Sequence, residues 1–190
     1  MTVKQYRAVD LSLFALMVIL SEALLVTAAT RWFPKEAYTV SATAALTAIV
    51  MVRWGSWAAI HAFLGGLVFC LLSGGAWWQY LVYCGGNMFC LALLPFMKWK
   101  PEGWLREDAL RSIVFGMAAL LLMQAGRALI SLFFGSGGAA FGFFTTDAVS
   151  MVFTMVVMWI VRRLDGVFEN QYHYLRRFHR EREQEEGGNP

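Results

Sequence analysis

The chain has 190 residues, of which 58% are hydrophobic and only 15% are charged, and its formal net charge is +3. A soluble domain carries about 25% charged residues, so the composition excludes an ordinary soluble globule and indicates one membrane-embedded domain. The three cysteines lie in apolar stretches without a CxxC pair, which favours small packing residues over a disulfide framework or a metal site.

Six apolar runs follow one another, and most approach the roughly 20 residues that a helix needs to cross a bilayer. Because lipid offers no partner to unpaired backbone groups, the runs predict an all-α bundle of six transmembrane helices. Turn-forming residues separate them, among them Pro34, Pro101 and the Gly135-Ser136-Gly137-Gly138 segment. The six runs are Leu11–Thr30, Ala37–Val52, Trp54–Leu72, Ala76–Met97, Ala109–Phe134 and Phe141–Val161.

The start of the chain has a second interpretation. Lys4 and Arg7 ahead of the first run would also suit a cleaved signal peptide. Glu22 interrupts the run, however, and the apolar stretch continues past the usual length of a signal-peptide core. A first transmembrane helix is therefore the favoured interpretation.

Lysine and arginine are divided unequally between the two sides of the predicted bundle. Thirteen of the 16 lie on the side that holds both termini, and two, Arg31 and Lys35, lie on the other side. Arg127 is the remaining one and falls inside the fifth run. By the positive-inside rule, both termini are predicted to be cytoplasmic, in a multi-pass protein of the plasma membrane.

Residues 166–190 form a tail that differs from the membrane domain of residues 1–165. Phe168, Tyr172, Leu175 and Phe178 recur at helical spacing beside basic residues, which predicts a cytoplasmic amphipathic helix. This helix would either lie on the membrane surface or against a partner, or extend the sixth helix into solvent. The polar end, residues 181–190, has the composition of a disordered segment.

Several polar side chains fall inside the apolar runs. An ionised side chain at mid-bilayer costs about 2.5–3.5 kcal/mol, so such residues face the bundle interior and indicate function by default. With a rise of 1.5 Å per residue, Arg127 and Asp147 are both predicted about 9–10 Å below the outer ends of their helices. The full set is Glu22, His61, Asn87, Gln124, Arg127 and Asp147.

Helical spacing groups these residues into faces. Trp77, Tyr80 and Asn87 share a face of the fourth helix, and Gln124 and Arg127 share a face of the fifth. Aromatic rings with a few polar groups are typical of a small-molecule pocket, here one that opens outward. The predicted substrate-binding residues are Glu22, Trp77, Tyr80, Asn87, Gln124, Arg127 and Asp147.

A purely structural interpretation of the same residues remains open. Arg127 and Asp147 could form a buried ion pair that only fixes helix register. Asn87 and Gln124 could hold helices together by hydrogen bonds, and His61 is expected to be a hydrogen-bonded packing residue.

Small residues recur four apart in the second and third runs. This spacing allows helices to approach closely, either within the bundle or at a docking face for a separate membrane subunit. The candidates for partner docking are Ala44, Ala48, Ala58 and Ala62.

Several motifs are absent from the sequence. There is no GxxxxGK[ST] loop, so the chain is not expected to hydrolyse ATP itself. There is also no HExxH or GxSxG motif and no nucleophile–base set. We therefore predict that the protein is not an enzyme, holds no metal or cofactor, and binds no nucleic acid.

The layout of about 190 residues, six helices and both ends inside resembles the S component of energy-coupling factor (ECF) transporters. The resemblance includes Arg53-Trp54-Gly55-Ser56-Trp57-Ala58-Ala59, which leads through Gly65-Gly66 to Ser73-Gly74-Gly75. It implies high-affinity capture of a vitamin or related micronutrient at a site in the outer half. It also implies membrane lipid around the helices, a transmembrane coupling subunit and two cytoplasmic ATPase subunits as partners.

The chain departs from that family at the docking motif. The family's AxxxA motif lies on the first helix, where this chain has Ala8 and Ser12 at that spacing. The alternative function is a non-transport membrane scaffold or assembly protein, whose buried polar residues would be structural. For a capture subunit, the mixed charges of the site predict an amphoteric ligand.

Overall fold

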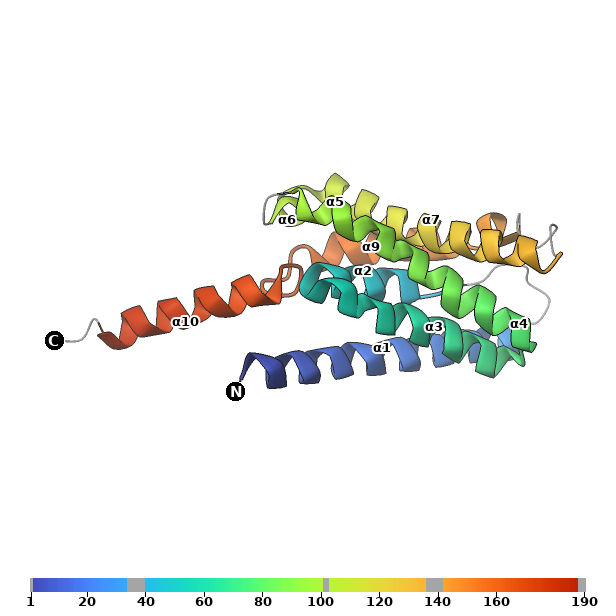
Figure 1. The fold of residues 1–190 in the computed structure, drawn as a ribbon, viewed down its shortest axis with the longest axis horizontal. Helices are drawn as coiled ribbons and strands as arrows, with labels where there is room; N and C mark the ends of the chain where they lie inside the picture. Colours follow the sequence, from blue (N-terminus) through green and yellow to red (C-terminus); the bar gives the residue numbers. More distant parts are fainter. Residues whose placement is uncertain (1, 34–39, 101–102, 136–141, 188–190) are drawn as a thin grey trace.

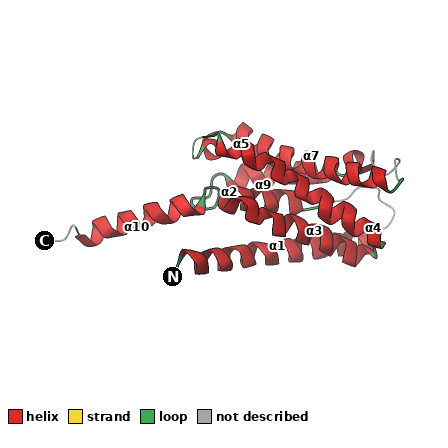
Figure 2. Cartoon of the chain, viewed as in Figure 1, coloured by secondary structure: helices red, strands yellow, loops and turns green. Residues whose placement is uncertain are grey.

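A computed structural model describes residues 2–33, 40–100, 103–135 and 142–187 of the chain. All regular secondary structure within these ranges is helical, as Figure 2 shows, which confirms the all-α prediction. The helices before residue 162 lie side by side in one elongated bundle, from which the last helix projects (Figure 1). Pro34, Lys35, Pro101 and most of the predicted glycine-rich turn, residues 136–138, lie outside the described residues.

Four helical stretches in the described part are long and apolar enough to cross a membrane: Val3–Trp32, Thr43–Ser73, Trp77–Lys98 and Ala109–Phe133. Ala148–Val161 is apolar but shorter. The membrane character inferred from composition is therefore carried by helices of suitable length. The main elements are α1 (Val3–Trp32), α2 (Thr43–Trp54), η1 (Gly55–Trp57), α3 (Ala58–Ser73), α6 (Trp104–Glu107), α7 (Ala109–Phe133), α9 (Ala148–Val161) and α10 (Gln171–Gly187).

The apolar stretch Thr43–Ser73 turns back on itself at Gly55. The backbone there has φ +62°, a left-handed conformation that glycine adopts without steric cost. A methyl group added to Gly65 would lie 2.1 Å from the Thr43 hydroxyl oxygen, so these two positions are in contact. Because Thr43 and Gly65 lie at nearly equal chain distances from the turn, α2 and α3 pack as an antiparallel pair.

Helix α2 occupies the centre of the bundle. All 12 of its residues are buried, and the helix contacts α1, α3, α7 and α9. A helix that is apolar on every side is suited to this position. Ala44 and Ala48 on α2 and Ala58 and Ala62 on α3 are each at most 1% exposed, so their small side chains pack within the bundle.

The helical stretch Trp77–Lys98 is irregular around its middle. It combines α4 (Trp77–Tyr80), a π-helical segment η2 (Leu81–Gly85), a 3₁₀ segment η3 (Met88–Leu93) and α5 (Leu94–Lys98). A π turn closes its hydrogen bonds over five residues instead of four. Side chains after this turn are therefore rotated relative to the positions that regular α-helical spacing predicts.

A charged cluster closes the end of the bundle that holds the N-terminus. Arg53 forms a two-point ion pair with Asp10, with N–O distances of 2.7 and 2.9 Å. Its Nη1 also donates to the carbonyl oxygens of Gly166 and Val167. The ion pair therefore joins α1 and α2 to the turn that follows α9.

Helix α10 leaves the bundle at this same end and points away from it, as Figure 1 shows. Its first residues are tied to α1, because Tyr6 donates to the Gln171 side chain and Arg7 donates to the Tyr172 hydroxyl. The three alternatives for this helix, on the membrane surface, against a partner or extended into solvent, stay predictions.

Candidate ligand-binding site

A cavity of about 250 Å³ borders the second half of α1, which is the half farther from the N-terminus. It is bounded by α1, α2, α3, η2, α7 and the residues just before α9. The described residues that line it are Glu22, Val40, Ser41, Thr43, Gly65, Gly66, Phe69, Tyr83, Asn87, Arg127, Gly142, Phe143, Thr146 and Asp147.

Three glycines let the helices around the cavity approach closely. A methyl group on Gly66 would lie 2.7 Å from backbone atoms of Tyr83 and Cys84. One on Gly86 would lie 2.6 Å from the Arg127 backbone nitrogen, and one on Gly126 would lie 2.5 Å from the Gly86 carbonyl oxygen. This contact between η2 and α7 brings Asn87 next to Arg127.

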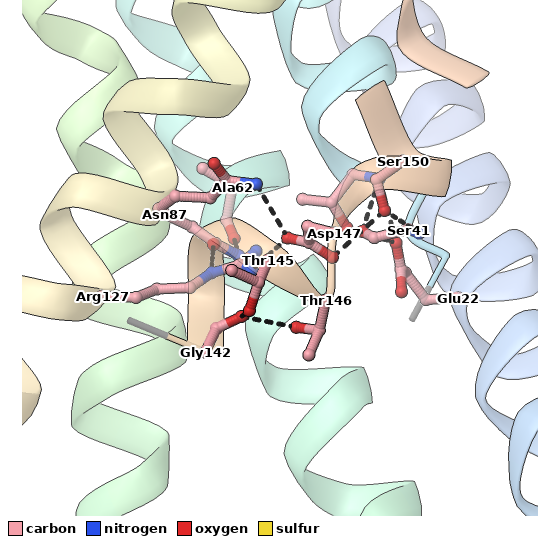
Figure 3. Close-up of polar contacts among 12 residues, drawn as sticks. Glu22, Ser41, Ala62, Asn87, Arg127, Gly142, Thr145, Thr146, Asp147 and Ser150 are labelled. Atoms are coloured by element: carbon pink, nitrogen blue, oxygen red, sulfur yellow. Dashed lines mark hydrogen bonds and ion pairs between the residues drawn. The ribbon is translucent and has the colours of Figure 1, made fainter. Parts of the chain in front are cut away.

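Arg127 is held between two other helical segments (Figure 3). Its Nε donates to Asn87 Oδ1 at 2.8 Å, and its Nη1 donates to Asp147 Oδ2 at 3.3 Å. Asn87 is itself fixed, because its side-chain nitrogen donates to the Ala62 carbonyl oxygen at 3.0 Å. The arginine, 7% exposed, is thus oriented by one amide and one carboxylate.

Asp147 contacts both Arg127 and the neutral polar side chains of Gln124 and Ser150. Gln124 Nε2 donates to Asp147 Oδ2 at 3.2 Å, and the Ser150 hydroxyl donates to Asp147 Oδ1 at 3.2 Å. The same Ser150 oxygen accepts a hydrogen bond from the Ser41 backbone nitrogen at 3.0 Å. Gln124 Oε1 is buried and has no partner among the described residues.

Glu22 lies on the opposite side of this network and is only 1% exposed. Its Oε1 accepts three hydrogen bonds, from the Ser41 hydroxyl at 2.5 Å, the Thr43 hydroxyl at 2.6 Å and the Thr43 backbone nitrogen at 2.9 Å. Three donors on one oxygen are an arrangement that suits a carboxylate. Figure 3 shows the chain of contacts from Glu22 through Ser41 and Ser150 to Asp147.

Aromatic rings complete the wall of the cavity. The Tyr83 ring lies 4.4 Å from the Phe69 ring and 5.8 Å from the Phe143 ring, measured between centroids. The Arg127 guanidinium lies 5.2 Å from the Tyr83 centroid, within the range of a cation–π contact. The cavity therefore combines buried charges with flat apolar surfaces, which is the usual composition of a small-molecule site.

Four of the seven predicted binding residues line this one cavity: Glu22, Asn87, Arg127 and Asp147. Gln124 is buried against Asp147 without lining the cavity. The other two, Trp77 and Tyr80, do not line it; Trp77 is 72% exposed and packs edge-on against Phe134. The π-helical segment between them and Asn87 explains the difference, because it rotates α4 out of phase.

Sequence reasoning missed Tyr83, Phe69, Ser41 and Thr43, all of which line the cavity. Tyr83 precedes Asn87 by four residues, so the spacing of neighbouring residues on a helical face could have found it. Ser41 and Thr43 lie inside the second apolar run, where small side chains indicate close helix packing rather than hydrogen-bond partners of Glu22.

A second cavity of about 450 Å³ lies at the other end of the bundle, between the end of α2, α5, α6 and the turn before α10. Its cationic and imidazole side chains, from Lys98, Lys100 and His173, are exposed. We place the candidate site in the first cavity because its charged side chains are buried and come from three different parts of the fold.

Among the described residues, no group of three or more His, Cys, Asp or Glu side chains could hold a metal ion. Comparisons of the chain with protein-family models, with curated proteins and with solved structures found no match. The function proposed below therefore rests on the geometry of the cavity and on the layout of the chain.

Proposed function

We propose that this protein is a high-affinity substrate-capture subunit for uptake of a vitamin or related micronutrient, similar to an ECF S component. One observation carries the proposal. Buried Glu22, Arg127 and Asp147, together with Asn87, surround a void of about 250 Å³ instead of packing only against one another. Buried polar groups that serve helix packing alone need no such space beside them.

The proposed topology has six spans with both termini in the cytoplasm. In support, the turn at Gly55 separates α2 from α3, and α9 supplies a further apolar segment beside α7. The distribution of lysine and arginine supports an extracellular position for the cavity in such a bundle. A ligand could then enter from outside the cell, as uptake requires.

The side chains around the void suggest a division of roles. Arg127 has five N–H donors and uses two of them on described residues, so it could also bind a ligand oxygen. Asn87 orients that guanidinium. Phe69 and Tyr83 would contact a ring, the role that spacing alone assigns to Trp77 and Tyr80.

The partners are proposed from the family resemblance. They are a transmembrane coupling subunit and two cytoplasmic ATPase subunits, since the chain has no ATP-binding loop of its own. Ala44, Ala48, Ala58 and Ala62 are buried in the isolated chain, so we do not assign the docking surface to them.

The decisive experiment is gentle purification from native membranes, followed by mass spectrometry of bound small molecules and proteins. We expect a vitamin-sized molecule and ATPase subunits to copurify with the chain. Arg127→Ala and Asn87→Ala should each reduce retention of the small molecule, whereas Arg111→Ala, which changes an exposed arginine, should not. Recovery of cytoskeletal or envelope proteins without ATPases would instead support the scaffold function.

A further inference from the structure

The charges around the cavity do not balance. Among the described residues that line it, two carboxylates, Glu22 and Asp147, face a single cation, Arg127. Arg127 forms its ion pair with Asp147, at 3.3 Å. Glu22 has no lysine, arginine or histidine partner in the described part of the chain.

The two oxygens of Glu22 have different surroundings. Oε1 accepts all three hydrogen bonds from Ser41 and Thr43, whereas Oε2 accepts none from the described residues. In Figure 3, accordingly, the second carboxylate oxygen of Glu22 has no dashed line. Because Glu22 lines the cavity and is only 1% exposed as a whole residue, Oε2 is the carboxylate oxygen left to accept a bond from an occupant of the cavity.

A buried carboxylate without a countercharge is costly, because it loses the hydration it would have in water. Hydroxyl and amide donors from Ser41 and Thr43 replace part of that hydration on one oxygen. A cation placed beside the other oxygen would supply the missing charge. The aromatic rings of Phe69 and Tyr83 favour the same sign of charge, because the face of a ring attracts cations.

The volume of the cavity limits the size of its occupant. Pockets for drug-sized molecules measure about 300–1,000 Å³, and this one measures about 250 Å³. A molecule built on one ring suits this space better than a flavin or another fused-ring system with a long side chain.

We propose that the captured ligand is a small single-ring organic cation, held at Glu22 Oε2, with a neutral acceptor group directed at Arg127. This inference rests on the proposed capture function and narrows the amphoteric ligand that mixed charges alone predict. Arg127 and Asp147 neutralise each other, so the net negative charge at Glu22 decides the sign of the ligand.

The test is the thermal stability of the purified chain in detergent, measured against a library of water-soluble metabolites sorted by net charge at neutral pH. The library includes three matched pyridines: the N-methylpyridinium form of nicotinamide, nicotinamide itself and nicotinate. They share a ring and differ in charge. We expect stabilisation by ring-bearing cations, and within the matched set by the N-methylpyridinium form above the other two.

Glu22→Gln removes the charge and keeps a side chain of the same shape. It should weaken binding of any stabilising cation by roughly tenfold to a hundredfold. Should that variant fail to fold, Phe69→Leu offers a second test, since it removes an aromatic face and leaves the charges unchanged. Phe69→Leu should weaken the binding of a cation more than the binding of a neutral ligand of the same size.

The results separate this inference from the capture function. If neutral or anionic compounds stabilise the chain and Arg127→Gln abolishes the effect, the cation proposal is wrong and the capture function stands. Stabilisation by sodium or potassium chloride alone would also overturn it, in favour of an inorganic ion. If no compound stabilises the chain, the ligand class is wrong, and absence of copurifying ATPases would then remove the capture function as well.

Discussion

Replacement of Arg53 by methionine should destabilise the protein strongly, although this residue lies far from the candidate site. Arg53 donates four hydrogen bonds, two to Asp10 and one each to the carbonyl oxygens of Gly166 and Val167. The side chains of Arg53 and Asp10 are only 6% and 11% exposed. The substitution would leave the Asp10 carboxylate largely buried, with the Trp54 indole nitrogen as its one remaining donor in the described part of the chain.

The expected loss follows from this uncompensated charge. Removal of one partner from a buried ion pair costs about 3–5 kcal/mol, mainly because the other charge stays out of water. We expect Arg53→Met to lower the free energy of unfolding by about 4 kcal/mol. Arg53→Lys should lose less, because it keeps the charge but not the planar fork that fits the carboxylate and the two carbonyl groups.

The free energy of unfolding can be measured by denaturation with sodium dodecyl sulfate in mixed micelles. The matched control is Arg111→Met, since Arg111 is half exposed and pairs with Glu107 and Asp108 on the surface. Arg111→Met should lower the free energy of unfolding by less than about 1 kcal/mol. If Arg53→Met and Arg111→Met lower the free energy of unfolding equally, the contacts of Arg53 do not hold α1, α2 and the turn after α9 together. That result would refute the role assigned to Arg53.

Three further predictions concern the cavity and the topology. Gly66→Ala should lower the free energy of unfolding by about 1–3 kcal/mol, because the added methyl group would lie 2.7 Å from the Tyr83 backbone. Gly142→Ala is the control: its methyl group would have no atom within 4 Å, so the free energy of unfolding should not change in the same assay. Arg127→Gln and Asp147→Asn should show a coupling energy of about 1–3 kcal/mol in a double-mutant cycle, and strict additivity would argue against their buried ion pair. In a variant with Cys70, Cys84 and Cys90 replaced by alanine, a membrane-impermeant maleimide should label Ser73→Cys from outside intact cells. Ser56→Cys should react only after the membrane is opened, and protection of Ser56→Cys under both conditions would favour one continuous span over two.

That Arg127 and Asp147 lie close together could be predicted from the sequence, because counting residues along two antiparallel helices brings them to a similar level, and the structure places them 3.3 Å apart. The predicted start of the sixth helix near Phe141 does not agree with α9, which begins at Ala148, so Asp147 caps this helix instead of lying about 9 Å inside it. The partners of Glu22 could not be predicted in this way. Ser41 and Thr43 reach it because α2 lies at the centre of the bundle, and the order of helices around the centre is not encoded in periodicity.

Helical phase was predictable only where the helix is regular. The π-helical segment Leu81–Gly85 rotates α4 and leaves Trp77 exposed, and residue spacing contains no signal for such a turn. The ion pair at the other end was missed for a different reason. Arg53 was interpreted through topology and the family resemblance, and Asp10 lies just before the first apolar run, where a carboxylate is not unusual.

The two buried arginines of this bundle show how structural and binding roles differ within one fold. The three guanidinium nitrogens of Arg53 donate four hydrogen bonds, and its partner Asp10 also accepts one from Trp54. Few donors or acceptors are therefore left for a ligand. Arg127 makes two hydrogen bonds with described residues, and it borders a void together with a carboxylate that has no cationic partner. Selection for stability alone would favour the first arrangement at both ends, because each unmet donor or acceptor in a membrane interior costs free energy. The incomplete bonding at this cavity is what the proposed ligand would complete when bound.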